Sequence, residues 1–251
     1  MPVDVLPERD GAVAVTHHAI RITFSPCGTI FNVTPNSLTF ELLDTMTTLI
    51  LIRHGHTDWA DKKLAGWLPD VHLNDRGKQQ AEALPERLAA IEIAAIYSSP
   101  LERTLETAQP LAKARSLRIH KVADLGEVKF GDWQGQTLKV LSNKKEWKIV
   151  QAAPSAFQFP GGESFRETQS RAVGAIEKIV AQHAKDTIVA FSHGDVIKLI
   201  VAYFSGIALD NFQRLAVSPA SINVIELGPF GARLGRLNDT GPLQNHQHPK
   251  K

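Results

Sequence analysis

A short apolar run that ends abruptly in polar residues constrains this chain more than any other feature. Residues 49–52 read LILI and are followed at once by Arg53, His54 and Gly55. Four aliphatic residues without polar alternation are typical of a strand buried on both faces, as in a parallel sheet covered by helices. Because two residues that favour water come next, the carboxyl end of this strand is expected to open into a site.

Strand and helix patterns alternate along the rest of the chain. Apolar runs predict strands over residues 48–53, 93–98, 118–122, 187–191, 221–227 and 232–237. Helical patterns follow Asn74, Pro100 and Ser164 and also cover residues 139–150 and 195–204. Pro85 is expected to kink or divide the first helix, and Ser164 with Glu167 forms a capping-box pattern. The alternation predicts an α/β fold, a three-layer α/β/α sandwich with a mostly parallel sheet and helices on both faces.

The first 45 residues do not join this alternation. They contain four prolines, show no sustained helical period, and end just before Met46, which precedes the first predicted strand. We expect residues 1–45 to be an extension, either disordered or absent from the native protein through a misread start site. Residues 46–238 are expected to form one domain, and the polar, basic residues 239–251 a flexible tail.

Composition argues against several functional classes. The net charge is only +2, and no basic stripe of the kind that binds nucleic acid is present. No apolar stretch reaches the roughly 18 residues of a membrane span, and the first residues do not resemble a secretory signal. Cys27 is the only cysteine, so no internal disulfide can form, and a reducing, cytoplasmic location is expected. Monomer and homodimer both remain open.

Residues of similar character follow three of the predicted strands: RHG at 53–55, SSPLER at 98–103 and SHG at 192–194. Because the carboxyl ends of parallel strands meet at one edge of a sheet, we expect two arginines and two histidines to lie together there. Guanidinium forks match phosphate oxygens. A neutral imidazole can attack phosphorus, and a second, protonated one can donate to the same oxygens. Such a site can transfer a phosphoryl group without a metal.

The motifs RHGHT at 53–57, SSPLERTLETA at 98–108 and SHG at 192–194 resemble those of the histidine phosphatase superfamily, which includes cofactor-dependent phosphoglycerate mutases. The resemblance spans about residues 48–227. It implies that His54 is the phosphorylated nucleophile, that Arg53 and Arg103 bind phosphate, and that His193 is the second histidine of the pocket. LGE at 125–127 followed by GDWQG at 131–135 resembles the acid region of the family, which implies Glu127 as general acid.

Further substrate-binding residues are expected at Thr57, Gly194 and Glu163. Thr57 belongs to the first motif, and Gly194 allows a close backbone approach where a helix presents its positive N-terminal end. Glu163, in GGES, either stabilises a helix N-terminus or lines the site, and the resemblance favours the site. Many relatives read RHGETxxN where this chain has His56 and Ala60, so one asparagine contact is missing. We expect His56 to face the entrance and affect substrate choice.

Three functions are compatible with these residues. The leading one is a metal-independent phosphomonoesterase that needs no cofactor and acts on a small phosphorylated metabolite through a phosphohistidine. A phosphomutase of this family carries a longer insertion, whereas only residues 136–160 separate GDWQG from GGES here, which favours an open site with water as acceptor. A non-catalytic phospholigand-binding module would need neither a nucleophile nor an acid.

Two smaller questions also stay open at this point. His54 and His56 are spaced like a metal pair, but no third ligand has suitable spacing. We expect residues 136–160 to govern selectivity. Within this segment, Trp147 and Phe157 are either contacts to an apolar leaving group or core residues.

Overall fold

The computed structural model describes residues 20–22, 31–33 and 46–241. The chain divides into two units, Met1–Asp44 and Thr45–Lys251. In the first unit, strand β1 (Ile20–Ile22) pairs antiparallel with β2 (Phe31–Val33). The rest of the predicted extension and most of the predicted tail lie outside the described residues.

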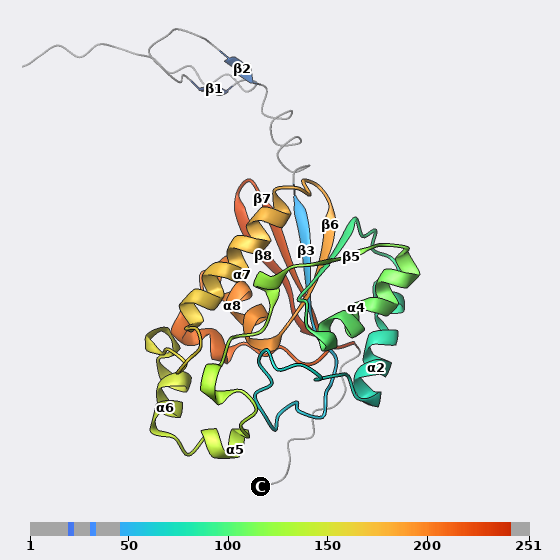
Figure 1. Ribbon diagram of the computed structural model, residues 1–251. Helices are drawn as coiled ribbons and strands as arrows, with labels where there is room; N and C mark the ends of the chain where they lie inside the picture. The colour runs from blue at the N-terminus through green and yellow to red at the C-terminus, as the bar shows by residue number, and fades with distance from the viewer. Residues whose placement is uncertain (1–19, 23–30, 34–45, 242–251) are drawn as a thin grey trace, which may run out of the picture. The chain divides into compact units, whose positions relative to one another are not determined.

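A six-stranded sheet with the strand order β5-β4-β6-β3-β7-β8 forms the centre of the second unit (Figure 1). Its strands are β3 (Thr47–Arg53), β4 (Ala95–Ser98), β5 (Ile119–Lys121), β6 (Thr187–Ser192), β7 (Ile222–Gly228) and β8 (Gly231–Asp239). The first four strands in this order run parallel, and β7 runs antiparallel to both β3 and β8. The mostly parallel sheet is therefore confirmed, with an antiparallel hairpin at one edge.

Helices cover both faces of the sheet and complete the predicted three layers (Figure 1). On one face lie α2 (Asp75–Glu82), α3 (Leu84–Arg87) and α4 (Glu102–Arg115), and on the other α7 (Phe165–Val180) and α8 (Gly194–Phe204). Leu49 and Leu51 join the core beneath α7 and α8, whereas Ile50 and Ile52 join the core beneath α3 and α4. Since successive strand residues point to opposite faces, two helix layers bury the whole LILI run.

Local signals set the ends of several helices. The Asn74 side chain caps α2 by accepting a hydrogen bond from the Gly77 amide at 3.0 Å. Pro85 stands at the start of α3 and separates it from α2, as predicted. Ser164 and Glu167 form the predicted capping box at the start of α7.

Two helix boundaries differ from the sequence expectation. Pro100 does not begin a helix, because α4 starts at Glu102 with Leu101 as its N-cap. The single helix expected over residues 139–150 is two short helices, α5 (Leu138–Leu141) and α6 (Lys145–Ala152). The side chains of Ser142 and Asn143 both donate to the Lys139 carbonyl and thus compete with continued backbone pairing where α5 ends.

A lobe of short elements covers the carboxyl end of the parallel strands (Figure 1). Besides α5 and α6 it contains the 3₁₀ turns η1 (Ala123–Leu125), η2 (Gly131–Trp133) and η3 (Pro154–Ala156), and η4 (Leu209–Arg214) follows α8. Phe157 is 7% exposed and packs against Trp133 and Phe159 with ring centroids 5.3 and 4.9 Å away. Phe157 is therefore a core residue. No helix in the described part of the chain is long and apolar enough to cross a membrane.

Candidate active site

The strand register brings the three sequence motifs to one edge of the sheet. β6 lies between β3 and β4, and it pairs Ser192 with Arg53 and Phe191 with Ser98. The same register continues past the ends of β3 and β4. The His54 amide donates to the Ser192 carbonyl at 3.0 Å, and the Ser99 amide donates to the Phe191 carbonyl at 2.9 Å. The residues that follow each strand therefore lie side by side, as the motif positions predicted.

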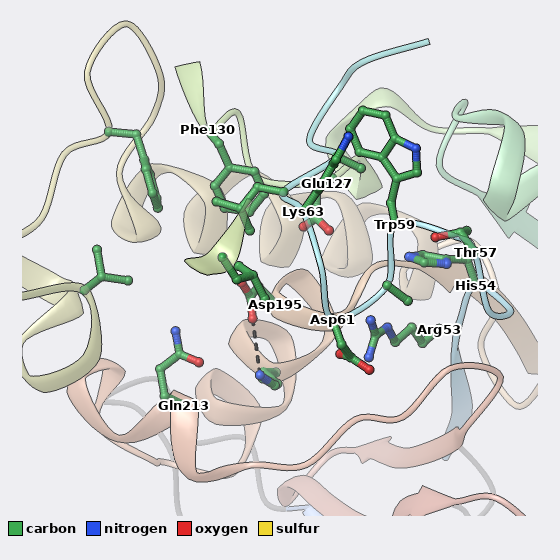
Figure 2. Close-up of a pocket in the computed structure, with 18 of the residues that line it drawn as sticks. Arg53, His54, Thr57, Trp59, Asp61, Lys63, Glu127, Phe130, Asp195 and Gln213 are labelled. Carbon is green, nitrogen blue, oxygen red and sulfur yellow. Dashed lines mark hydrogen bonds and ion pairs between the residues drawn. The ribbon is translucent and has the colours of Figure 1, made fainter. Parts of the chain in front are cut away.

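A pocket of about 290 Å³ opens above this edge. Figure 2 shows Arg53, His54 and Thr57 grouped on one side of it. The other expected site residues in its lining are Arg103, Glu127 and Gly194. His193 does not reach the surface, as its residue is 0% exposed.

His54 has the geometry of a neutral nucleophile. Its Nδ1 lies 2.8 Å from the Gly55 carbonyl, an acceptor only, so Nδ1 carries the proton and Nε2 carries the free lone pair. Burial, together with the charges of Arg103 and Arg53, lowers the pKa of His54 well below its ordinary value. The imidazole is therefore unprotonated at neutral pH and able to attack an electrophile.

The loop that carries His54 is tied to helix α4. The Gly55 amide donates to Thr107 Oγ1 at 2.9 Å, and the Thr107 hydroxyl donates to the Arg103 carbonyl at 2.6 Å. A side chain at Gly55 would also meet the Gly77 carbonyl, because its Cβ would lie 2.7 Å from that oxygen. Tight packing of the backbone here fixes His54 relative to Arg103.

Within the described part of the chain, three buried donors of the cluster have no hydrogen-bond partner: Arg53 Nε, Arg103 Nη1 and His193 Nδ1. Each arginine is fixed at another nitrogen, since Arg53 Nη1 donates to the Val217 carbonyl and Arg103 Nη2 to the Gly66 carbonyl, both at 2.8 Å. Unpaired buried donors are rare in folded proteins and call for an explanation. An anion such as a phosphoryl group would accept from all three.

His193 is held by Ser99 and lies beneath His54. Its Nε2 is 2.9 Å from Ser99 Oγ, and its ring centroid is 5.3 Å from that of His54. Burial and the Arg103 charge, followed by His54 itself, lower the pKa of His193 well below its ordinary value. The ring is therefore neutral among these groups and can donate from Nδ1 when Ser99 donates to Nε2. Its protonation beside a bound anion stays a prediction.

Gly194 begins helix α8 beside Arg53. A Cβ at Gly194 would lie 3.2 Å from Arg53 Nε, so the absence of a side chain leaves room for the guanidinium next to the helix N-terminus. The first amide groups of α8 have no partners within the helix and favour a negative group. Gly194 and Arg53 therefore lie side by side in the pocket lining, where an anion would meet both.

Glu127 carries a carboxyl group suited to giving and taking a proton near neutral pH. Burial, and next the charge of Asp195, raise its pKa to about 7, against the opposing pull of Arg103. Its Oε1 accepts from the Val128 amide at 2.9 Å, and its Oε2 lies 3.8 Å from His193 Nδ1. A carboxyl group in this position can serve as general acid and then as general base.

The part of the chain that contains this pocket matches a known protein family. A sequence model described as the histidine phosphatase superfamily (branch 1) matches residues 49–240. The chain belongs to this superfamily. The predicted family and its α/β fold are both confirmed.

Individual histidine phosphatases are similar over most of this chain. Phosphoserine phosphatase 1 of Hydrogenobacter thermophilus is 31% identical over 197 residues, 78% of this chain and 93% of that protein. The structure of Bacillus stearothermophilus YhfR matches with a TM-score of 0.72 and 32% identity, over 77% of this chain and 97% of that one. Phosphoserine phosphatase of Entamoeba histolytica, in complex with 3-phosphoglyceric acid, matches with a TM-score of 0.68 and 28% identity, over 77% and 97% of the two chains.

Two residues of this histidine phosphatase lie elsewhere than the sequence suggested. The Glu163 carboxylate does not line the pocket but forms an ion pair with Arg171. His56, expected at the entrance, does not line the pocket either, because its Nδ1 meets the Asn74 side-chain amide at 2.9 Å. Ala60 and Trp147 do line the pocket. Trp147 also packs against the core and stacks on Trp133, so the choice between a leaving-group contact and a core residue stays open.

The pocket lining also includes charged residues that sequence reasoning missed. Lys198 pairs with Asp195 at 3.2 Å, the interaction dashed in Figure 2, and Lys63 lies 4.8 Å from the centre of the Trp59 ring. Asp195 directly follows the SHG motif, so its place near the pocket could have been predicted from that motif. Lys63 and Trp59 belong to an irregular loop, and no sequence pattern pointed to them.

Proposed function

We propose that this histidine phosphatase hydrolyses phosphomonoesters through a phosphohistidine on His54. In the first half-reaction, His54 Nε2 attacks phosphorus, a nitrogen–phosphorus bond forms and the ester oxygen–phosphorus bond breaks. Glu127 gives its proton to the departing oxygen, so the alcohol leaves neutral. Arg53 and Arg103 hold the phosphoryl oxygens through the transfer.

The second half-reaction restores the enzyme with water. Glu127, now a carboxylate, takes a proton from water as the water oxygen attacks phosphorus. The nitrogen–phosphorus bond breaks, His54 Nε2 regains its lone pair, and inorganic phosphate forms. His193 Nδ1, the Gly194 amide and Thr57 are proposed as further contacts to the phosphoryl group.

One observation carries this proposal more than any other. The three partnerless donors, Arg53 Nε, Arg103 Nη1 and His193 Nδ1, are buried beside a neutral imidazole whose Nε2 is free. Anion binding alone would explain the donors but not the free nucleophile or the carboxyl with a pKa of about 7. The combination supports phosphoryl transfer over a phospholigand-binding module.

The substrate is proposed to be a small phosphorylated metabolite with a second anionic group. The pocket volume of about 290 Å³ suits a small molecule, and Lys63 and Lys198 are among the residues that line it and offer positive charge to a second anionic group. The relatives named for phosphoserine, and the one bound to 3-phosphoglyceric acid, support a carboxylated phosphomonoester. Phosphoserine and 3-phosphoglycerate are therefore the first compounds to assay.

The decisive experiment measures phosphate release, in the presence of EDTA, from phosphoserine, 3-phosphoglycerate, phenyl phosphate and p-nitrophenyl phosphate. Wild type is compared with His54→Ala and with His56→Ala, a matched control in the same loop. We expect a loss of at least about 1,000-fold in His54→Ala and near-normal release in His56→Ala. Mass spectrometry of Glu127→Gln treated with p-nitrophenyl phosphate should find phosphate on His54.

The contrary outcomes separate the alternatives. No release by wild type from any ester would overturn the hydrolase proposal. Interconversion of 2- and 3-phosphoglycerate would then establish a mutase, and binding of inorganic phosphate without turnover would establish a binding module. Release that EDTA abolishes would overturn the metal-independent mechanism.

A further inference from the structure

Side chains, and not a helix or a strand, hold the backbone around Glu127. This stretch lies between η1 and η2, and its carbonyl groups accept hydrogen bonds from distant residues. Ser192 Oγ donates to the Leu125 carbonyl at 2.7 Å, and the Trp67 indole N–H donates to the Glu127 carbonyl at 2.5 Å. Since buried carbonyl groups need such partners, the position of the acid depends on these side chains.

Arg171 of α7 supplies the remaining hydrogen bonds to these carbonyls. Its Nη1 donates to the carbonyls of Asp124 and Gly126 at 2.7 and 2.9 Å, and its Nη2 to the Glu127 carbonyl at 2.9 Å. One guanidinium thus engages three of the four consecutive carbonyls from residue 124 to residue 127. The planar, rigid fork of an arginine can do this, whereas the single ammonium of a lysine cannot.

Glu163 orients the Arg171 guanidinium and also binds the backbone on the C-terminal side of Glu127. Arg171 Nε donates to its Oε2 at 3.0 Å and Nη2 to its Oε1 at 2.5 Å. Oε1 also accepts from the Lys129 amide at 2.9 Å. Burial by itself raises the pKa of Glu163, but the hydrogen bonds from Arg171 and Lys129 outweigh it and lower the pKa. The Glu163 carboxylate is therefore ionised at neutral pH.

We propose that Arg171 and Glu163 are positioning residues that hold the backbone on both sides of Glu127 and so place its carboxyl group against the leaving oxygen. Neither side chain lines the pocket. The inference rests on the proposed function, because only a reaction that protonates its leaving group needs Glu127 placed in this way. A misplacement of a catalytic group by about 1 Å costs roughly 100-fold in rate. The hydrogen bonds from Arg171 that fix this loop therefore affect the rate through the position of Glu127.

The test uses two aryl esters that differ in their need for a general acid. p-Nitrophenolate leaves readily without a proton, whereas the phenolate of phenyl phosphate is a poorer leaving group. The variants are Arg171→Lys, which keeps the charge but loses the fork, and Glu163→Gln, which keeps the shape but loses the charge. Arg166→Lys is the matched control, since Arg166 is an exposed residue of the same helix that donates to the Ser155 carbonyl.

We expect kcat/KM for phenyl phosphate to fall about 10-fold or more in Arg171→Lys, with a much smaller fall for p-nitrophenyl phosphate. Inhibition by inorganic phosphate should stay within about threefold of wild type, because Arg53 and Arg103 are untouched. The alkaline limb of the pH profile should also move to lower pH, because a loosened loop admits water to Glu127. Glu163→Gln should show the same pattern more weakly, and Arg166→Lys should match wild type.

Equal losses on both esters, or no loss on either, would overturn the positioning role. So would weaker phosphate inhibition that accounts for the whole effect. If Arg171→Lys does not fold, as judged by its thermal transition, Glu163→Gln decides by the same two esters. A wild type that releases no phosphate from either ester would overturn the proposed function itself, and the two failures are thus distinguishable.

Discussion

The imidazole rings of His54 and His193 lie 5.3 Å apart between centroids and are tilted by 58°. His54 is reached from the pocket, whereas His193 is fully buried behind it and is held through Nε2 by Ser99. Burial, followed by the charge of Arg103, lowers the pKa of both histidines. The pKa values of the two histidines thus shift in the same direction, but their access to the pocket differs, and we predict that His54 is the one that meets a substrate's phosphorus.

Replacement of Ser99 by alanine should weaken the donor at His193 Nδ1. Without the Ser99 hydroxyl, the proton is free to move to Nε2, and Nδ1 then no longer donates to the phosphoryl group. We expect kcat/KM to fall about 10-fold, the cost of one hydrogen bond to a charged group, with little change in thermal stability. The measurement is steady-state hydrolysis of p-nitrophenyl phosphate. A loss equal to that of Ser98→Ala, the neighbouring buried serine, would show that only packing matters.

The rate of hydrolysis should fall on the alkaline side of neutrality. Glu127 must be protonated to act as general acid, and its pKa is about 7, so kcat/KM should decline as pH rises through that value. His54 is already neutral in this range because its pKa is lowered. Profiles for phenyl phosphate from pH 5 to 9 test this. In Glu127→Gln the alkaline limb should disappear, and its persistence there would assign it to another group.

Glu127→Gln should stabilise the fold at alkaline pH. The folded-state pKa of about 7 lies above the reference value of 4.5, so the favourable contribution of this group is complete below the lower value and lost as pH rises through the higher one. At pH 8 the wild type carries a buried negative charge at Glu127, which costs stability, and the neutral glutamine removes that charge. We expect a gain of about 1–3 kcal/mol, or several degrees in Tm. Thermal melts at pH 5 and pH 8 should show a much larger gain at pH 8.

Two helical glycines should respond to alanine with opposite signs. At Gly77 in α2 a Cβ would lie 2.1 Å from the His56 carbonyl oxygen, whereas at Gly174 in α7 a Cβ meets nothing within 4 Å. Gly174→Ala is expected to stabilise by about 0.5–1 kcal/mol through helix propensity. Gly77→Ala is expected to destabilise by about 2 kcal/mol or more, because backbone must move. Urea unfolding of both variants measures this, and equal effects would contradict the close approach of α2 to the His54 loop.

Much of the fold and the centre of the site were predictable because they depend on short, local patterns. The LILI run is buried on both faces whatever its partners are, and Asn74 and Ser164 cap helices through atoms a few residues away. Arg53 ends β3, and His54 and His193 directly follow β3 and β6, so the order of the strands brings them together. For these residues, position along the chain was enough to predict that they lie together.

Other features escaped sequence reasoning because they depend on contacts between distant segments. His56 was assigned to the entrance, but Asn74 holds its ring elsewhere. Arg171 lies 44 residues after Glu127 and carries no motif of its own. Its role appears only when α7 packs beside the acid loop.

The sequence by itself determined the layered α/β fold, the family and the edge of the sheet where the chemistry gathers. These follow from periodicity and from side chains at strand ends, both encoded within a few residues. Only the tertiary structure decided which histidine faces the pocket, that Glu163 binds Arg171 and not the pocket, and that the pKa of Glu127 rises to about 7. Burial and the charges of neighbours determine these properties, and neither exists until remote parts of the chain come together.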